Sequence, residues 1–448
     1  MMAEKEFELG LFKKASKLVE KYKIKYNPED QIPTDEMADD VYSAAIELVC
    51  DVGMYHMDTH RCIKFDEDEV REHIGSLPSE LLIGEGKERV RFAARRPESN
   101  DPPLIGAGHV RCSESVAREL YISLAQLPNI HWLEGYVTTH TRGMPLRGGP
   151  YDVIASLREM RTLRDSITEA GAPGKHLMFY CISPTAACYI ASMNPDYGIR
   201  KTDAIRFTHL TEMKIEDNSL SAVPVALNYG CFIQSGGFSF LGGYAGGPEG
   251  VAITTLASAI GDFIVFRSNW QWRPNTFPLK DPDKEGKDPE VVWSANLATL
   301  AFARNIPAPQ ALLVVSGPES GNLFRYLEIA SNAISVVPFG AHLQLCRPTV
   351  PLRENLMTPL EAQFLGEVGR AAAKQRLKRE EAYEISRKLL KKTEHLYNLP
   401  IKERKKSHLF IGKPFEELYD MKTLRPKDEE LRLYEMAKKS VVESGLHL

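Results

Sequence analysis

The sequence predicts an α/β fold, a (β/α)8 TIM barrel with an α-rich amino-terminal extension and a helical carboxyl-terminal segment. Between residues 101 and 350, short apolar runs alternate with amphipathic stretches of helical period. The runs are apolar on both faces, which is typical of parallel strands covered by helices. About eight such units over roughly 250 residues fit a closed barrel. Periodicity leaves an open doubly wound sheet as the alternative.

The first hundred residues are expected to form an α-rich extension that packs on the barrel. Thr34 can cap a helix whose apolar positions share one face, and Gly53 can end it. Asp66 is placed to cap a second helix. Residues 89–96 alternate enough for a strand.

The barrel region, residues 101–350, is divided by its pattern into helices and strands. The predicted helices are 113–127, 150–171, 202–215, 248–264, 288–304 and 319–336. The predicted strands are 131–137, 175–182, 222–228, a run ending at 239–241, 263–268, 311–316 and 340–346. Residues 351–448 are predicted to add three helices, 360–373, 380–397 and 429–444, to the same domain.

Residues 236–250, GGFSFLGGYAGGPEG, are unusually rich in glycine. Their glycines can take positive φ and approach a ligand closely, and Pro248 suits the first turn of a helix. A strand-to-helix turn of this kind offers free N–H groups to a ligand or an anion. A simple tight turn is the alternative interpretation.

The composition is that of an ordinary globular protein with a large core. Hydrophobic residues are 43% of the 448, and 60 acidic against 56 basic residues leave a formal charge of −4. This balance gives no reason to expect nucleic acid or an anionic membrane as a partner. The best candidate for a membrane span, residues 254–266, is too short and contains Asp262. We therefore expect a cytoplasmic protein.

Metal and cobalamin motifs are weak in this sequence. His56-Met-Asp58-Thr-His60 places two imidazoles and a carboxylate within five residues, but no further ligand cluster is evident. The seven cysteines are scattered and never in C-x-x-C spacing, so free thiols are expected. Ile63 stands where a D-x-H-x-x-G cobalamin loop needs glycine. We expect this chain to bind neither a metal nor cobalamin itself.

Reacting groups in a barrel come from the carboxyl ends of its strands. The candidates there are Met178, Phe179, Tyr180, Cys181, Asn228, Tyr229, Arg267, Trp270, Trp272, Ser316 and Glu319, with Arg206 from the start of its predicted helix. Each of them, taken alone, is explained as well by core packing or a surface ion pair.

Several ordered blocks carry a family resemblance along nearly the whole chain. They are IPTD from residue 32, DTHR from 58, AGAPG from 170, LTEMKI from 210, GGYAGG from 242, and the later MTPLEAQFLGEVGRA and YDMKTLRP. With them the sequence resembles the monomethylamine:corrinoid-protein methyltransferases of methanogenic archaea. The resemblance implies a (β/α)8 barrel, a symmetric homo-oligomer such as a hexamer, and methyl transfer to a separate corrinoid protein.

The family's distinctive residue is a pyrrolysine, whereas this chain has only standard residues. Counting without gaps places Met178 at the pyrrolysine position, and one small gap shifts it to Cys181. The same counting carries two family glutamates onto Arg206 and Gly236, and a glutamine and a tyrosine onto the neighbourhood of Ala311 and Leu313. The resemblance therefore implies a retained scaffold with a changed active centre.

The changed centre favours a quaternary or betaine-like methyl donor. In the family, the imine of pyrrolysine is thought to orient the amine, whereas a quaternary ammonium leaves as a neutral tertiary amine and needs mainly positioning. Aromatic side chains would supply cation–π faces worth roughly 0.5–2 kcal/mol each, and Arg206 would bind a carboxylate. The expected pocket is Arg206, Tyr180, Cys181, Gly236, Tyr244, Trp270, Ala311 and Leu313, with Met178 at the catalytic position.

Two alternatives stay open. A methoxylated or methylthio donor is one, and such chemistry usually needs zinc to activate the heteroatom. The other is a barrel that has lost its chemistry and serves as a binding subunit of a corrinoid methyltransferase complex.

Overall fold

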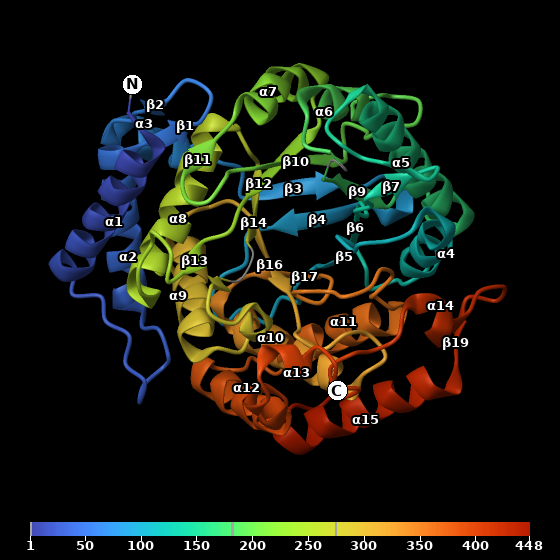
Figure 1. Cartoon of the computed structure of the whole chain (residues 1–448). Helices are drawn as coiled ribbons and strands as arrows, with labels where there is room; N and C mark the ends of the chain where they lie inside the picture. The colour runs from blue at the N-terminus through green and yellow to red at the C-terminus, as the bar shows by residue number, and fades with distance from the viewer. Residues whose placement is uncertain (1, 181–182, 274–275) are drawn as a thin grey trace.

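Eight parallel strands close into a barrel at the centre of the protein (Figure 1). The structure is a computed structural model and describes residues 2–180, 183–273 and 276–448. Around the barrel the strands are β5 (Ile105–Ala107), β6 (Trp132–Glu134), β9 (His176–Phe179), β10 (Ala204–Thr208), β12 (Phe232–Gly236), β14 (Trp270–Arg273), β16 (Gln310–Val314) and β17 (His342–Leu345). The predicted (β/α)8 barrel is thereby confirmed, and the alternative of an open doubly wound sheet is excluded.

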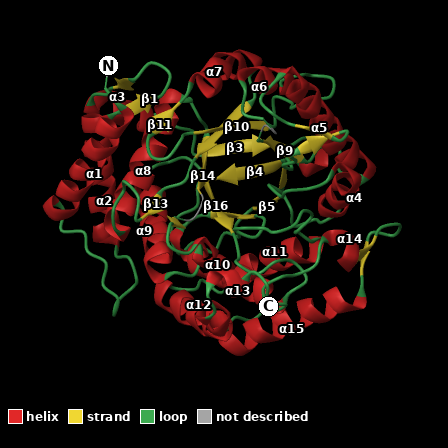
Figure 2. Cartoon of the chain, viewed as in Figure 1, coloured by secondary structure: helices red, strands yellow, loops and turns green. Residues whose placement is uncertain are grey.

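Helices surround the strands on all sides (Figure 2). They are α4 (Glu114–Ala125), α5 (Pro150–Glu169), α6 (Ala186–Ser192), α7 (Asp217–Tyr229), α8 (Pro248–Val265), α9 (Pro289–Asn305), α10 (Leu323–Val336) and α11 (Pro359–Lys374). The carboxyl-terminal helices α12 (Arg379–Thr393) and α15 (Asp428–Ser444) pack on α10. The short α13 (Ile401–Arg404) and α14 (Phe415–Leu418) lie between them in the chain.

The predictions for three barrel elements, residues 202–215, 222–228 and 263–268, were wrong. The predicted helix 202–215 is strand β10 followed by the two-residue β11 (Lys214–Ile215), and the predicted strand 222–228 lies inside α7. The predicted strand 263–268 covers the end of α8, and the strand itself is β14. Helix α7 contains Pro224 and ends at Gly230 in the left-handed region, φ 83°. Its short apolar run therefore has the local composition of a strand although its packing makes it a helix.

A hairpin of the amino-terminal extension closes one end of the barrel. It consists of β3 (Glu80–Ile83) and β4 (Val90–Ala93). The N–H of Gly84 donates to the carbonyl of Thr202, which precedes β10, so the hairpin covers the amino ends of the strands. Phe92 packs on the rings of Trp132 and Trp270, with centroids 5.6 and 4.8 Å apart. These aromatic rings form a floor beneath the barrel interior.

The rest of the extension packs on the barrel's outer helices. It contains α1 (Glu4–Lys21), α2 (Asp35–Val52) and α3 (Glu67–Gly75), and α2 contacts both α8 and α9. As predicted, the side chain of Thr34 caps α2 and that of Asp66 caps α3. Strands β1 (Met54–His56) and β2 (Arg61–Ile63) join β11 in a small sheet beside the barrel.

Helix α8 is long and apolar enough to cross a membrane by length and composition. It is nevertheless a core helix, because 78% of it is buried inside the structure. Its neighbours are α1, α2 and α9, which cover its outer surface.

Candidate active site

A layer of large side chains fills the barrel near the carboxyl ends of its strands. Parallel pairing sets Arg206 opposite Gln234 and Leu313 opposite Gln344. We call the inward-facing set Glu134, Arg206, Gln234, Trp272, Leu313 and Gln344 the upper layer. The carboxyl end of a barrel is where catalytic groups are found.

The upper layer is organised around an ion pair between Arg206 and Glu134. Both side chains are fully buried, and two guanidinium nitrogens of Arg206 donate to the two carboxylate oxygens, Nη2 to Oε2 at 2.9 Å. Nε of Arg206 donates to Oε1 of Gln234, and Nε2 of Gln344 donates to Glu134. The guanidinium carbon lies 4.0 Å from a ring centroid of Trp272. A paired, stacked guanidinium of this kind is held rigidly.

His109 completes the network from the loop that follows β5. Its Nδ1 lies 2.8 Å from Oε1 of Glu134, and its ring packs edge-on against Tyr180 and Trp272 at 5.5 and 6.0 Å. Burial lowers the pKa of His109, although Glu134 acts in the opposite direction. A neutral imidazole leaves the cluster with one positive and one negative charge.

Two hydrogen-bond donors of the upper layer have no partner within the described ranges. They are Nε2 of Gln234 and Nε1 of Trp272, and both atoms are buried. Arg206 uses Nε and one N–H on each of its terminal nitrogens, which are three of the five donors of a guanidinium. Buried polar groups normally find a partner. The layer therefore has spare donors for a ligand acceptor such as a carboxylate.

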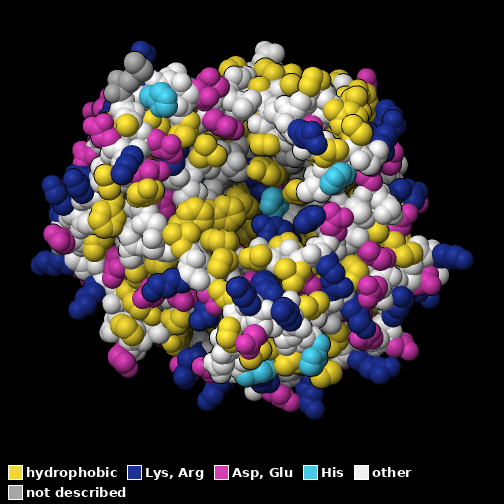
Figure 3. Space-filling model, in the orientation of Figure 1, with side chains coloured by type: hydrophobic (Ala, Val, Ile, Leu, Met, Phe, Trp, Pro, Cys, Tyr) yellow, Lys and Arg dark blue, Asp and Glu magenta, His cyan; other side chains and the backbone are white. Residues whose placement is uncertain are grey.

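The face shown in Figure 3 is hollowed near its centre, with hydrophobic side chains on one side of the hollow and basic and histidine side chains on the other. The partly exposed residues above the upper layer are His109, Tyr180, Gly237, Phe238 and Arg347. Solvent reaches this rim but not the ion pair below it, since Arg206 and Glu134 have no exposed surface.

A second carboxyl group lies near the rim. Burial raises the pKa of Glu285 to about 8, against the effect of Arg347. Glu285 is therefore mostly neutral at pH 7 and adds little negative charge to the rim.

A family model of the monomethylamine methyltransferase MtmB matches residues 1–446. The chain belongs to this family. It is 28% identical over 441 residues to MtmB2 of Methanosarcina acetivorans and 27% identical over 440 residues to MtmB1 of Methanosarcina barkeri. Each alignment covers 97% of this chain and 92% of the relative.

The fold is that of a solved family member. The crystal structure of the Methanosarcina barkeri MtmB superposes with a TM-score of 0.91 at 24% identity, covering 100% of this chain and 96% of that one. The same values hold for a hydroxylamine complex of MtmB. The chain is accordingly a methyltransferase of the MtmB family with a complete family barrel.

Three predicted site residues lie one layer below the ion pair. Met178, Trp270 and Ala311 pack in one cluster with Trp132 and Phe92 of the aromatic floor. Met178 and Ala311 have no exposed surface, and Trp270 is 1% exposed. The catalytic role of Met178 stays a prediction, and its enclosed position gives that role no support.

The other predicted residues are spread over the mouth and beyond it. Tyr180 is on the rim and Leu313 is in the upper layer, where it packs with Trp272. Gly236 ends β12, where a side chain would collide with the Trp272 carbonyl. Tyr244 is 41% exposed, and a hydrogen bond between its side chain and Glu8 of α1 raises the pKa of Tyr244. Cys181 lies outside the described residues.

The glycine-rich segment does not continue a barrel strand. Its predicted strand end is the short β13 (Phe240–Leu241), which pairs with β15 (Phe277–Pro278) beside the mouth. The barrel strand is β12, which ends at Gly236. The helix start at Pro248 is as predicted, with Gly247 at the cap position.

Sequence reasoning missed four members of the network. Glu134 and Gln344 are polar residues inside strands that were predicted, so a count of polar interruptions in the apolar runs would have found them. Gln234 lies in β12, whereas the strand predicted for this region was placed to end at residues 239–241. His109 follows β5, a strand that the sequence pattern did not predict.

A groove of about 530 Å³ lies away from the barrel mouth, between α9, α10 and α12. Its lining includes Lys287, whose ammonium lies 3.3 Å from the ring centroid of Tyr397. Burial lowers the pKa of Lys287 to about 8. The groove contains no residue of the upper layer, and we assign the chemistry to the mouth.

Proposed function

We propose that this enzyme moves a methyl group from a small betaine-like quaternary amine to Co(I) of a separate corrinoid protein. The observation that carries the proposal is the guanidinium of Arg206 at the centre of the barrel mouth. The relatives are named for monomethylamine, which is a cation without a carboxylate at neutral pH. The donor must suit a pocket that already contains a cation.

Electrostatics disfavours a simple ammonium donor here. Glu134 is already engaged by Arg206, His109 and Gln344. A second cation beside the guanidinium would therefore meet a positive charge, and Glu285 near the rim is mostly neutral. A zwitterion avoids this cost, because its own carboxylate can accept from Gln234 Nε2, Trp272 Nε1 and the remaining N–H groups of Arg206.

The rim suits the other end of such a donor. Tyr180 and Phe238 offer aromatic surface to a quaternary ammonium, and a cation–π contact is worth about 0.5–2 kcal/mol. As the methyl group passes to Co(I), the electrons of the broken C–N bond stay on nitrogen. The amine leaves neutral and needs no proton, so positioning and exclusion of water are the main demands on the enzyme.

The test is a methyl-transfer assay with the cognate corrinoid protein reduced to Co(I). We expect a methylcobalamin spectrum with glycine betaine and related zwitterions, and none with monomethylamine. Choline is the matched control donor, because it keeps the quaternary ammonium and lacks the carboxylate. Methylation by monomethylamine, with no zwitterion active, would contradict the proposal.

A second candidate is a binding subunit without turnover. It is favoured by the burial of Arg206, whose guanidinium covers the Trp272 face that a substrate cation would use. Docking of the corrinoid protein with no methylation by any donor in the panel would support it. In either case we propose a cytoplasmic homo-oligomer with the corrinoid supplied by its partner, and size-exclusion chromatography tests the oligomer.

A further inference from the structure

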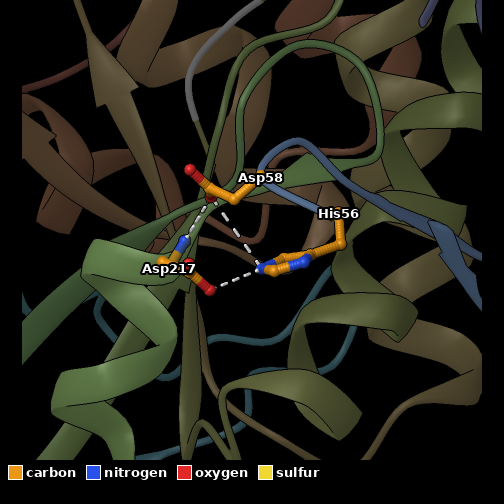
Figure 4. A group of neighbouring side chains, drawn as sticks. All are labelled: His56, Asp58 and Asp217. Carbon is orange, nitrogen blue, oxygen red and sulfur yellow. Dashed lines mark hydrogen bonds and ion pairs between the residues drawn. The ribbon is translucent and has the colours of Figure 1, made fainter. Parts of the chain in front are cut away.

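Three potential metal ligands from distant parts of the chain meet beside the barrel (Figure 4). His56 ends β1, Asp58 is in the turn that follows it, and Asp217 begins α7. The parallel pairing of β1 with β11 sets His56 opposite Ile215, two residues before Asp217. The small sheet thus brings the amino-terminal extension against the start of a barrel helix.

Nε2 of His56 faces both carboxylates. It lies 3.0 Å from Oδ1 of Asp217 and 3.9 Å from Oδ2 of Asp58. Oδ2 of Asp58 also accepts the backbone N–H of Asp217 at 2.8 Å. The imidazole is 10% exposed, whereas the Asp58 and Asp217 side chains are 47% and 66% exposed. One ligand is therefore fixed and two can adjust.

The imidazole is oriented from its other nitrogen. Nδ1 of His56 lies 2.7 Å from Oγ1 of Thr59. With Nδ1–H as the donor, Nε2 carries its lone pair, which is the form that binds metals. Nε2 is buried and has no hydrogen-bond partner within the described ranges, despite its approach to Asp217. In this tautomer a lone pair faces two carboxylates, and a cation between them would relieve the repulsion.

We propose that His56, Asp58 and Asp217 bind a divalent transition-metal cation of the Zn²⁺ type, with water completing the coordination. In tetrahedral geometry, metal–ligand bonds of about 2.0–2.2 Å put neighbouring ligand atoms roughly 3.3–3.6 Å apart. The His56–Asp217 distance of 3.0 Å is slightly below this range and the His56–Asp58 distance of 3.9 Å is slightly above it. Each exposed carboxylate therefore needs a shift of under about 1 Å. The nitrogen ligand selects Zn²⁺, Co²⁺ or Ni²⁺ over Mg²⁺ and Ca²⁺, which prefer all-oxygen sites.

The site departs from the sequence-based expectation of no metal. That expectation considered His56, Asp58 and His60 together, but Nδ1 of His60 instead lies 2.9 Å from the hydroxyl of Tyr55. The third ligand, Asp217, is too far along the chain for any spacing rule. The metal would fasten the extension to the barrel and so stabilise their contact.

The test is isothermal titration of chelator-stripped, full-length protein with ZnCl2 and, separately, MgCl2. We expect a Zn²⁺ site that Mg²⁺ does not fill at the same concentration. Asp217→Asn and Asp58→Asn should each weaken this site at least about tenfold. Both side chains are largely exposed, so these variants should fold, and asparagine at 58 can still accept the N–H of Asp217.

Glu216→Gln is the matched control, because it removes a neighbouring negative charge but no ligand. It should bind Zn²⁺ like the wild type. Zn²⁺ at about 100 times its Kd should raise the wild-type Tm by about 2–3 °C and leave Asp217→Asn unchanged. Absence of Zn²⁺ binding, or equal titrations for wild type and Asp217→Asn, would overturn the proposal.

Discussion

Replacing Arg206 by methionine should destabilise the enzyme by about 3–5 kcal/mol, because Glu134 would be left as a buried charge without its cation. Arg206 donates to both carboxylate oxygens and to Gln234, and it stacks on Trp272. Methionine fills similar space but restores none of these hydrogen bonds.

The assay is urea denaturation at pH 7, read as a change in midpoint with an unchanged m-value. Glu134→Gln alone should also destabilise, since it leaves the buried guanidinium without a counter-ion. The double variant should cost less than the sum of the two by about 1–3 kcal/mol, because both charges are then gone. Single-variant costs below about 1 kcal/mol, or costs that simply add, would refute the idea that this pair organises the mouth.

Two further predictions concern the barrel wall. Burial alone would raise the pKa of Asp203, but Arg164 and Arg200 lower it to about 2. The carboxylate therefore stabilises the fold above its unfolded pKa of about 3.9, and this contribution of about 2–3 kcal/mol is lost as pH falls toward 2. Asp203→Asn should lack this stabilisation already at pH 7. Urea denaturation of the wild type and the variant at pH 7 and at about pH 2.5 measures the difference in their free energies of unfolding, which should shrink at the lower pH. Gly106→Ala should lower Tm, at a cost of about 1–3 kcal/mol, because the added methyl group would collide with the indole of Trp132 in β6. Gly75→Ala is the control, because a methyl group at residue 75 meets no other atom. Equal melting curves for the two variants would contradict the packing argument.

The barrel itself could be predicted because its signal is local and repeated. Apolar runs of strand length alternate with amphipathic helices, and side chains such as Thr34 and Asp66 cap the helices as their sequence context indicates. The prediction failed between residues 202 and 229 because tertiary contacts override local preference there. Arg206 interrupts an apolar run in the middle of β10, and its buried charge is paired there with Glu134 from another strand.

The candidate site could be predicted only in part. Arg206, Tyr180 and Leu313 were found because each lies near the end of an apolar run or on a family position. The pairing that gives Arg206 its role was not predicted, since Glu134 is on another strand and barrel closure brings the two together. Asp217 of the proposed metal site was missed because the pairing of β1 with β11, distant in the chain, brings it to His56.

The aromatic floor has a consequence for the order in which the chain can acquire its structure. Phe92 packs against Trp132, Trp270 and His342, the last of which is on the eighth barrel strand of the chain. During synthesis the hairpin emerges long before that strand exists, so its apolar face must wait for most of the polypeptide to be made. Chains that end before β17 should therefore expose this face and aggregate, even though they contain the whole amino-terminal extension.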